Sequence, residues 1–201
     1  ARNLARKPDR LDHRTAAVCC LDDLGLLSFS GPDTRRFLQG QLSNDIGRLR
    51  PGTLLRTGLH SPQGRTLAVL ALAAGPIDAG PIDTAADAAA PDGAQQVLAV
   101  LPRELLATTA ATLKRYVLRA KVSISDESAA HRLYGVVPAV MPAAAPLPAA
   151  VAGCYAYDGQ RMLVIARGAD DSPAGTTLTR ARWRALDIAA GLPQLYAASS
   201  G

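Results

Sequence analysis

The stretch LLSFSGPDTRRFLQGQLSNDI, residues 26–46, holds the signals that decide the fold. It opens as a short apolar strand, which Gly31-Pro32 interrupts. A helix then begins, with Pro32 in its first turn and Asp33 near its positive end. The apolar residues that follow recur at three- and four-residue spacing, as in Phe37, Leu38 and Leu42, so we expect the helix to pack one face on a core.

Two features of this stretch leave alternatives open. Gly40 interrupts the apolar face, where a glycine costs about 1 kcal/mol relative to alanine and marks either close backbone packing or the helix end. Ser43-Asn44-Asp45 follows between two apolar residues. These three polar residues predict either a capped turn that starts a short helix or the polar wall of a ligand pocket.

Composition excludes several classes of protein. The 201 residues are 48% apolar, so the chain can bury a sizeable core. The net charge of +5 is spread thinly, without the interleaved basic and aromatic residues of a nucleic-acid surface. Cys19, Cys20 and Cys154 show no metal-ligand spacing, so we expect reduced, mostly buried thiols in a cytoplasmic protein and no metal site. No apolar run approaches the roughly 20 residues that span a bilayer.

Strand signals dominate the chain, and helices are interspersed without regular βαβ alternation. This pattern predicts an α+β fold with antiparallel sheets and packed helices. Hairpins are expected around Asp22-Asp23, around 61–64 and around Asp158-Gly159. The expected strands are 16–20, 24–30, 53–60, 65–73, 96–101, 120–125, 131–137, 154–157 and 161–166.

Two further helices are expected. Residues 103–119 carry an apolar face and end in a basic cluster, which is either a solvated helix end or a seat for an anionic tail. The cluster comprises Lys114, Arg115, Arg119 and Lys121. Residues 180–190 form the final helix, capped at Thr176 or Thr179 and stopped by Gly191, with Trp183 on its apolar face.

The remaining segments suggest the domain organisation. Residues 1–15 predict a flexible N-terminal arm without the apolar follow-on of a secretory signal. Residues 74–94 form a low-complexity loop, and 138–152 an extended Ala/Pro linker. Residues 16–201 are expected to form one folded region, with 16–130 and 131–201 as interlocked subdomains.

Four stretches together resemble the YgfZ-type folate-binding proteins, relatives of the glycine-cleavage T-protein (aminomethyltransferase). They occur in the family's order and span nearly the whole chain. The four stretches are 37–41 (FLQGQ) with Asn44-Asp45, 61–65 (SPQGR), 113–116 (LKRY) with Lys121-Val122, and 183–193 (WRALDIAAGLP). The resemblance implies a T-protein-like folate-binding fold with ferredoxin-like subdomains.

The chain departs from the family pattern at two places. The family motif Lys-Gly-Cys-Tyr-x-Gly-Gln-Glu would follow beyond Gly201, so the sequence is expected to lack the signature cysteine and the C-terminal barrel. Many relatives place a glutamate before the last Ala-Gly, where it binds the pterin ring, but here that position is Ala189.

The resemblance also implies a function and its residues. The carboxylate that the T-protein uses in one-carbon transfer falls at about Leu67 and Ala68, neither of which acts as an acid or base. We therefore expect no catalytic residue and a tetrahydrofolate-binding accessory protein that supports iron–sulfur cluster assembly and, through it, tRNA modification. Its partners would be iron–sulfur assembly proteins or client enzymes, without nucleic acid or membrane.

The folate-binding residues implied by the resemblance are Trp183, which would stack on the ring, Leu24 at the family's other aromatic position, and Asn44 and Asp45 at the ring edge. Two other functions stay open. One is a folate-dependent aminomethyl- or methyltransferase that uses a different acid, for which Asp45 is the candidate. The other is an interaction scaffold that binds no ligand.

Overall fold

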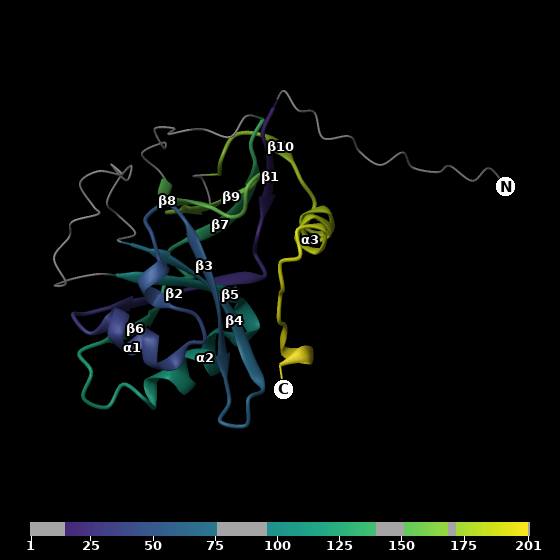
Figure 1. Ribbon diagram of the computed structural model, residues 1–201. Helices are drawn as coiled ribbons and strands as arrows, with labels where there is room; N and C mark the ends of the chain where they lie inside the picture. Colours follow the sequence, from purple (N-terminus) through teal and green to yellow (C-terminus); the bar gives the residue numbers. More distant parts are fainter. Residues whose placement is uncertain (1–14, 76–95, 140–150, 169–171, 201) are drawn as a thin grey trace.

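The computed structural model describes residues 15–75, 96–139, 151–168 and 172–200. Within them the chain forms two five-stranded sheets, with helices on the face of one sheet and beside the other. Figure 1 shows the two sheets stacked, with α3 and the segment that follows it running down one side of the molecule. The α+β fold with antiparallel sheets that the sequence predicts is confirmed in this coarse form.

The first sheet has the strand order β3-β4-β5-β2-β6, and all its neighbours are antiparallel. The apolar run of residues 24–29 is buried on both faces, which places β2 in the interior of this sheet. Its strands are β2 (Leu24–Ser30), β3 (Leu54–His60), β4 (Thr66–Ala74), β5 (Val97–Pro102) and β6 (Ser123–Asp126).

The second sheet has the order β10-β1-β7-β9-β8, in which only the short β10 runs parallel to its neighbour. Its strands are β1 (Ala17–Cys20), β7 (Arg132–Val137), β8 (Val151–Ala156), β9 (Met162–Ala166) and β10 (Thr176–Thr177). The first sheet thus takes strands from residues 24–126, and the second joins β1 to strands that follow residue 131. The division of the fold into subdomains at residue 130 stays a prediction.

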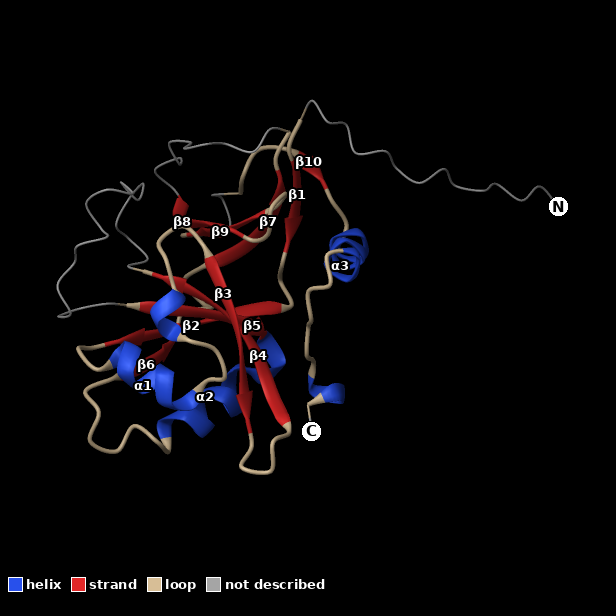
Figure 2. Cartoon of the chain, viewed as in Figure 1, coloured by secondary structure: helices blue, strands red, loops and turns tan. Residues whose placement is uncertain are grey.

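Helices α1 (Thr34–Gln41) and α2 (Leu106–Lys114) cover one face of the first sheet (Figure 2). The buried face of α1 carries Phe37 and Leu38, as the spacing in the sequence predicts. They pack with Leu27, Phe29 and other residues of the sheet in one apolar core. Each large side chain buried in this way contributes about 1.5–3 kcal/mol.

A second core lies between the two sheets and α3 (Arg180–Ala189). It joins Leu26 and Leu98 of the first sheet to Leu163 and Ile165 of the second. Trp183 of α3 completes it and is fully buried. This core is where the candidate site lies.

The break at residues 31–33 occurs where the sequence predicts it. Gly31 has φ +126°, and a Cβ there would lie 2.2 Å from the carbonyl oxygen of Lys121, so this turn requires glycine. Asp33 precedes α1, but its carboxylate accepts a hydrogen bond from the Lys121 N–H at 2.8 Å instead of capping the helix. Gly40 has open space around it and lies one residue before the helix end, so it marks the end and not a close contact.

The expected hairpin around Asp22-Asp23 is wrong. β2 has β5 along one edge and β6 along the other, which leaves no edge for β1. β1 instead pairs with β7 and β10 in the second sheet. The hairpins β3–β4 and β8–β9 form as predicted.

The helix expected over 103–119 is shorter. A 3-10 turn, η3 (Arg103–Leu105), precedes α2, and the helix ends at Lys114. Leu118 then adopts φ +41°, which no helix continues through. The basic residues that follow the helix are exposed, in agreement with a solvated helix end.

The expected arm over 1–15, loop over 74–94 and linker over 138–152 fall almost entirely outside the described residues. Among the helices that are described, none has the length and apolarity needed to cross a bilayer.

Candidate functional site

A buried arginine joins the β8–β9 turn to α3. Arg161 is 3% exposed and ion-pairs with Asp158 at 2.7 Å and with Asp187 at 2.8 Å. Asp158 also shapes the turn, because its Oδ1 accepts hydrogen bonds from the N–H groups of Gln160 and Arg161, both at 2.8 Å. The turn predicted at Asp158-Gly159 therefore orients Arg161 toward the helix.

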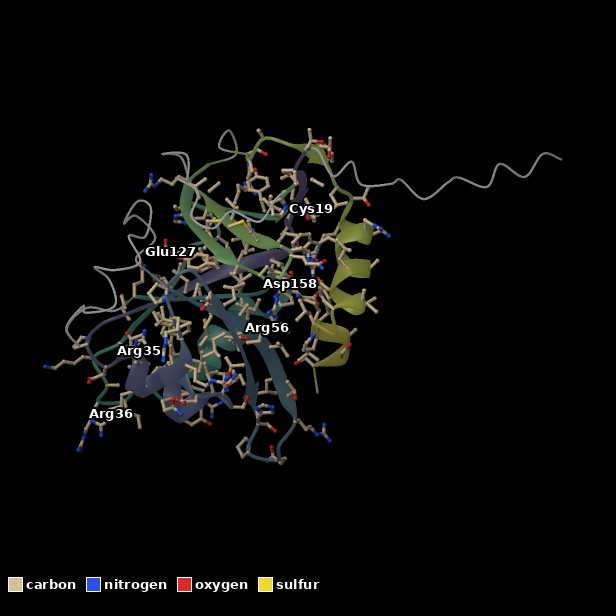
Figure 3. The ribbon with its side chains drawn as sticks, turned by 45° about the horizontal axis from the view of Figure 1, so that its top comes forward. Cys19, Arg35, Arg36, Arg56, Glu127 and Asp158 are labelled. Carbon is tan, nitrogen blue, oxygen red and sulfur yellow. The ribbon has the colours of Figure 1, made fainter. Side chains whose placement is uncertain are left out.

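Tyr157 lies at the centre of this region. The Arg56 guanidinium lies 4.6 Å from the Tyr157 ring centroid and that of Arg161 lies 4.9 Å away. The ring of Trp183 packs against Tyr157 at 5.1 Å and against the Arg161 guanidinium at 4.6 Å. Figure 3 places Arg56 and Asp158 together beside α3. We call these residues the Arg161 cluster; they are Arg56, Tyr157, Asp158, Arg161, Trp183 and Asp187.

The surroundings of the cluster shift its titrating groups. Partial burial raises the pKa of Asp158, but hydrogen bonds from Gln160 and Arg161 outweigh this effect and hold the pKa below its ordinary value. Burial, reinforced by the charge of Asp187, raises the pKa of Tyr157. At neutral pH Asp158 is therefore a carboxylate and Tyr157 a neutral phenol.

Four buried polar atoms of the cluster lack a hydrogen-bond partner among the described residues: Arg56 Nη2, Arg161 Nη2, Trp183 Nε1 and Asp187 Oδ2. Arg161 Nη2 is ion-paired with Asp158, which leaves the other three. A buried polar atom of this kind costs about 1–3 kcal/mol unless water or a ligand satisfies it. Two donors and one acceptor are thus available to a polar molecule that reaches the cluster.

The structure brings two of the four expected folate residues together. Leu24 and Trp183 belong to the same core as Tyr157, and they are 3% and 0% exposed. Trp183 is covered by Arg161, Tyr157 and Gly135, so a ligand reaches its ring only after these neighbours move. The role of Trp183 and Leu24 in binding stays a prediction.

Asn44 and Asp45 lie apart from that core, beside the edge of β3 that faces away from β4. Asn44 donates from Nδ2 to the Arg56 carbonyl oxygen at 2.8 Å, and its N–H bonds Thr57 Oγ1 at 3.1 Å. The Asp45 Oδ1 accepts from the Gly47 N–H at 2.9 Å and caps η1 (Ile46–Arg48). The capped turn predicted here is what forms, and Asn44 touches the candidate site only through the backbone of Arg56.

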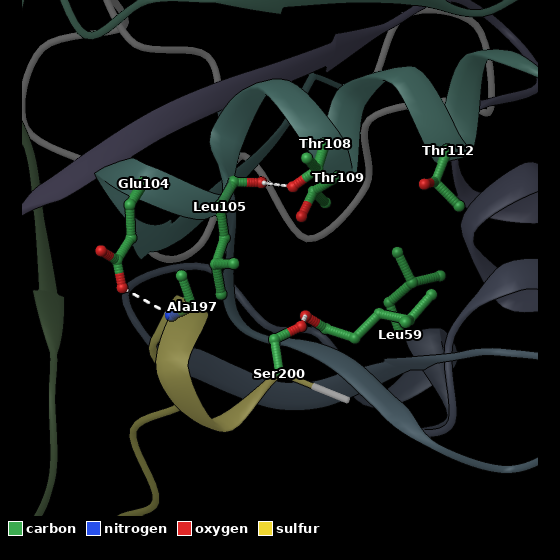
Figure 4. Close-up of a pocket in the computed structure, with 9 residues that line it drawn as sticks. Leu59, Glu104, Leu105, Thr108, Thr109, Thr112, Ala197 and Ser200 are labelled. Carbon is green, nitrogen blue, oxygen red and sulfur yellow. Dashed lines mark hydrogen bonds between the residues drawn. The ribbon is translucent and has the colours of Figure 1, made fainter.

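Three cavities lie around the cluster and the segment after α3. A cavity of about 20 Å³ is lined by Leu24, Arg56 and Tyr157. A second, of about 280 Å³, is lined by Leu67, Glu104 and Thr108 (Figure 4). An open groove of about 770 Å³ runs past Asp158 and Ala189. Of the four expected folate residues, Leu24 alone lines one of these three cavities.

A pterin ring does not fit between Leu24 and Trp183 in this conformation. Pockets for ligands of this size measure about 300–1,000 Å³. The cavity beside Leu24 measures about 20 Å³, which is room for a single water molecule. The structure is thus closed toward the implied cofactor.

Sequence reasoning missed Arg56, Tyr157, Arg161 and Asp187. A signal exists for Arg161 and Tyr157, because they flank the Asp158-Gly159 turn and strand alternation directs both to the same core as Leu163. Arg56 and Asp187 show no comparable signal, since charged residues in strands and helices usually face solvent.

Nothing in the described residues points to thiol or metal chemistry. Burial raises the pKa of Cys19 and of Cys154 to about 11, so both are protonated at neutral pH. All three cysteines are free. No group of three histidine, cysteine or acidic residues capable of holding a metal occurs in the parts of the chain that are described.

Comparison with known proteins gives distant relatives. No protein-family model matches the chain. It is 30% identical over 111 residues to the iron-sulfur cluster assembly factor IBA57 homolog, mitochondrial, of Mycosarcoma maydis, a match that covers 52% of this chain and 25% of that protein. It is 36% identical over 52 residues to the aminomethyltransferase of Desulforamulus reducens, which covers 26% of this chain and 14% of that protein.

The fold is similar to a solved structure, the glycine cleavage system aminomethyltransferase T from Bartonella henselae. The TM-score is 0.59 at 14% identity, over 89% of this chain and 52% of that one. The chain thus spans a quarter or less of the two sequence relatives and about half of the structural neighbour. The chain is thus similar in sequence, over part of its length, to an aminomethyltransferase and to an iron-sulfur cluster assembly factor, and similar in fold to an aminomethyltransferase.

Proposed function

We propose that this chain is the folate-binding part of a YgfZ-type accessory protein, which binds tetrahydrofolate in the cytoplasm and supports iron–sulfur cluster assembly and thereby tRNA modification. The proposal combines the fold, the sequence relatives and the family stretches of the sequence. The iron-sulfur cluster assembly role comes from the printed name of the Mycosarcoma maydis relative.

The observation that carries the proposal is the apolar wall at Leu67 and Ala68 of β4. Ala68 is fully buried in the core under α1 and α2. Leu67 faces the 280 Å³ cavity, so the position that carries a carboxylate in the T-protein presents a hydrocarbon here. A general acid or base is required for aminomethyl transfer by that route, and this strand supplies none. Binding without transfer is the function that this wall favours.

Leu24, Arg56 and Tyr157 are the residues that would hold the ring of a bound folate. Arg56 offers a free Nη2 donor, and the apolar surface of Leu24 suits a planar ring. In the closed structure they have no room for it, so the proposal requires these residues to become uncovered.

Calorimetric titration of tetrahydrofolate tests the binding. We expect saturable binding that Ala71→Leu weakens, because Ala71 lines the cavity beside Leu24 and extra bulk takes up the ring's space. The control is Ala107→Leu on the exposed side of α2. Trp183→Ala is a poorer probe, since emptying a buried tryptophan site costs about 3–5 kcal/mol of stability. Absence of binding to well-folded protein contradicts the proposal.

The cellular role is tested separately. In a strain that lacks the full-length protein, iron–sulfur enzyme activities are expected to fall and to recover with the wild-type gene but not with the Ala71→Leu gene. Normal iron–sulfur enzyme activities in that strain contradict the assembly role and leave folate binding intact.

A folate-dependent one-carbon transferase is the second candidate, and one observation favours it. Glu104 lines the same cavity as Leu67 and is held there by the Ala197 N–H (Figure 4). Asp45, the acid that sequence reasoning favours, instead caps η1. Turnover of an aminomethyl donor that Glu104→Gln abolishes, and Asp45→Asn does not, would support a transferase. If neither turnover nor folate binding is found, the remaining hypothesis is an interaction scaffold.

A further inference from the structure

Residues 193–200 run beside β4, from the core between the two sheets to the side of the first sheet where η3 and α2 lie. In Figures 1 and 2 this segment descends from α3 beside β4 and ends in the short helix η4 (Ala197–Ser199). Ser200 Oγ donates to the Leu67 carbonyl oxygen at 2.8 Å, and the Ala197 N–H donates to Glu104. The segment is therefore fixed to the sheet at β4 and at η3.

This segment separates two cavities that share one wall. Pro193 and Gln194 line the cavity beside Leu24, and Ala197 and Ser200 line the 280 Å³ cavity. The wall is β4: Leu67 lines the larger cavity, and Val69 and Ala71 line the smaller one. The larger cavity borders the core under α2, whereas the smaller one borders the core between the two sheets. The two cavities thus follow one another along β4.

We propose that residues 193–200 form a movable strap that closes one elongated ligand cleft, which runs along β4 from Leu24 and Arg56 to Glu104 and Thr108. The occupant is a planar heteroaromatic compound with an extended polar tail, the reduced folate of the proposed function, on which this choice of ligand rests. With the strap displaced, the two cavities and the volume of the strap itself join. Their sum falls in the range of about 300–1,000 Å³ that is usual for ligand pockets.

The Tyr196 phenol holds the strap to the rest of the protein. We call Tyr196 and its partners Asp23, Arg180 and Arg184 the latch. Tyr196 Oη donates to Asp23 Oδ2 at 3.0 Å and accepts from Arg184 at 3.2 Å and from Arg180 at 3.4 Å. Asp23 in turn ion-pairs with Arg180 at 2.6 Å and with Arg184 at 3.0 Å. The latch therefore ties the strap to the β1–β2 connection and to α3, outside both sheets.

The strap is weakly held compared with the core beneath it. Every residue from 193 to 200 is exposed or half-buried, whereas the neighbouring Trp183 and Leu101 are buried. Segments with few buried apolar contacts open locally at low free-energy cost while the core stays folded. Leu67, Val69 and Ala71 of β4 are half-buried, so the strap covers this strand incompletely.

The two ends of the cleft differ in chemistry, so a bound ligand should take one orientation along it. At one end the Arg56 guanidinium, with its free Nη2, lies beside the apolar Leu24 and suits a ring that carries a hydrogen-bond acceptor. At the other end, the hydroxyls of Thr108 and Thr112 and the carboxylate of Glu104 suit polar groups that donate hydrogen bonds (Figure 4).

Alkylation of a thiol placed under the strap tests its movement without any ligand. In Val69→Cys protein, the rate of reaction with iodoacetamide is measured peptide by peptide, with the exposed Cys20 as internal reference. Adding Tyr196→Phe removes the latch and should raise the rate about tenfold or more, as expected for the loss of a hydrogen bond to a charged group. The matched control is Tyr116→Phe, which changes an exposed tyrosine of the same chain.

The outcomes separate the strap from the folate proposal. An unchanged rate in Tyr196→Phe, and in Ser200→Ala as a second release of the strap, overturns the strap. A raised rate that tetrahydrofolate suppresses supports both the strap and its ligand. A raised rate that tetrahydrofolate leaves unaffected supports the strap and overturns folate as the occupant. Circular dichroism excludes general unfolding as the cause of a raised rate.

Discussion

At the scale of single residues, the buried Arg161 governs the site. It lies between Asp158 and Asp187 and stacks on Trp183, so it neutralises a carboxylate in the second core. Arg161→Met leaves Asp187 buried without a partner, which we expect to cost about 3–5 kcal/mol in the free energy of unfolding. Asp187→Asn should cost less, because Arg161 keeps Asp158. Urea unfolding measures both, and equal costs would contradict the central place of Arg161.

Gly135 of β7 gives a second prediction at this scale. A Cβ at this position would lie 2.5 Å from the ring of Trp183, which is fully buried. Overpacking a tight core costs about 1–3 kcal/mol, so Gly135→Ala should lower the thermal midpoint. Gly159→Ala is the control, since a Cβ there meets nothing within 4 Å. A midpoint that stays at the wild-type value would mean that Trp183 packs loosely.

Individual residues were predictable from the sequence where their neighbours in the chain decide their environment. Asp45 caps a turn because it precedes a short helix, and Thr179 caps α3 for the same reason. The surroundings of Trp183 could not be predicted, because Arg161 and Tyr157 come from a hairpin some 25 residues away. Asp187 was missed because its partner lies on that hairpin and not on its own helix.

At the scale of elements, the end of α2 departs from the sequence pattern. Leu113 and Val117 continue the apolar spacing, yet the helix stops at Lys114 and Leu118 takes φ +41° with 88% of its surface exposed. A leucine in this region of backbone space is strained, whereas glycine is not. The fold overrides local periodicity here because residues 120–126 must return to pair with β2.

Leu118→Gly should therefore stabilise the protein by about 0.5–1 kcal/mol, the gain from removing the strain less the added entropy of the unfolded chain. Urea unfolding checks this value. Leu118→Ala is the control, because alanine removes the exposed side chain and keeps the strain. A less stable Leu118→Gly protein would show that the turn is not strained.

Hairpins were predicted well where a two- to four-residue turn joins strands of one sheet, as in β3–β4 and β8–β9. The β1–β2 connection shows the limit of such signals. Asp22-Asp23 resembles a hairpin turn, but Leu21 beside it is buried and its N–H bonds Leu133 across the second sheet. A turn motif fixes the local direction of the chain, whereas the pairing of β2 with β5 and β6 leaves no edge for β1.

At the scale of the whole molecule, the strap makes the site depend on pH. Partial burial raises the pKa of Asp23, but the hydrogen bond and charge of Arg180, with bonds from Arg184 and Tyr196, hold the pKa below its ordinary value of 3.8. A carboxyl group shifted downward stabilises the folded contact above its ordinary pKa, and the effect is lost as the pH falls through the lowered value. The latch should therefore loosen in acid below about pH 4.

The Tyr196 phenol limits the stability of the latch at high pH. Burial and the bond to Asp23 raise the pKa of Tyr196 above its ordinary value of 10.0. A group shifted upward stabilises the contact below its ordinary pKa, and the effect is lost as the pH rises through the raised value. The NMR signals of the Ala197 and Ser200 amides should show that the strap loosens at both low and high pH. Asp23→Asn should abolish the change at low pH. Signals that follow those of core amides at every pH would show that the strap has no separate opening.

The two-sheet architecture of the whole chain follows from its sequence in outline, because strands without βαβ alternation predict antiparallel sheets. The sequence does not predict the closed cleft. Residues 193–200 have too few apolar residues to predict where they dock, and their position depends on Asp23, Leu67 and Glu104, which are distant in sequence.

Calorimetric titration of tetrahydrofolate into the wild-type chain and into Tyr196→Phe, side by side, tests most directly whether the cleft under the strap binds folate. We predict saturable binding to both proteins, tighter in Tyr196→Phe because less free energy is spent on opening the strap. Equal affinity would place folate outside the cleft. No saturable heat from either well-folded protein would contradict folate binding by this chain.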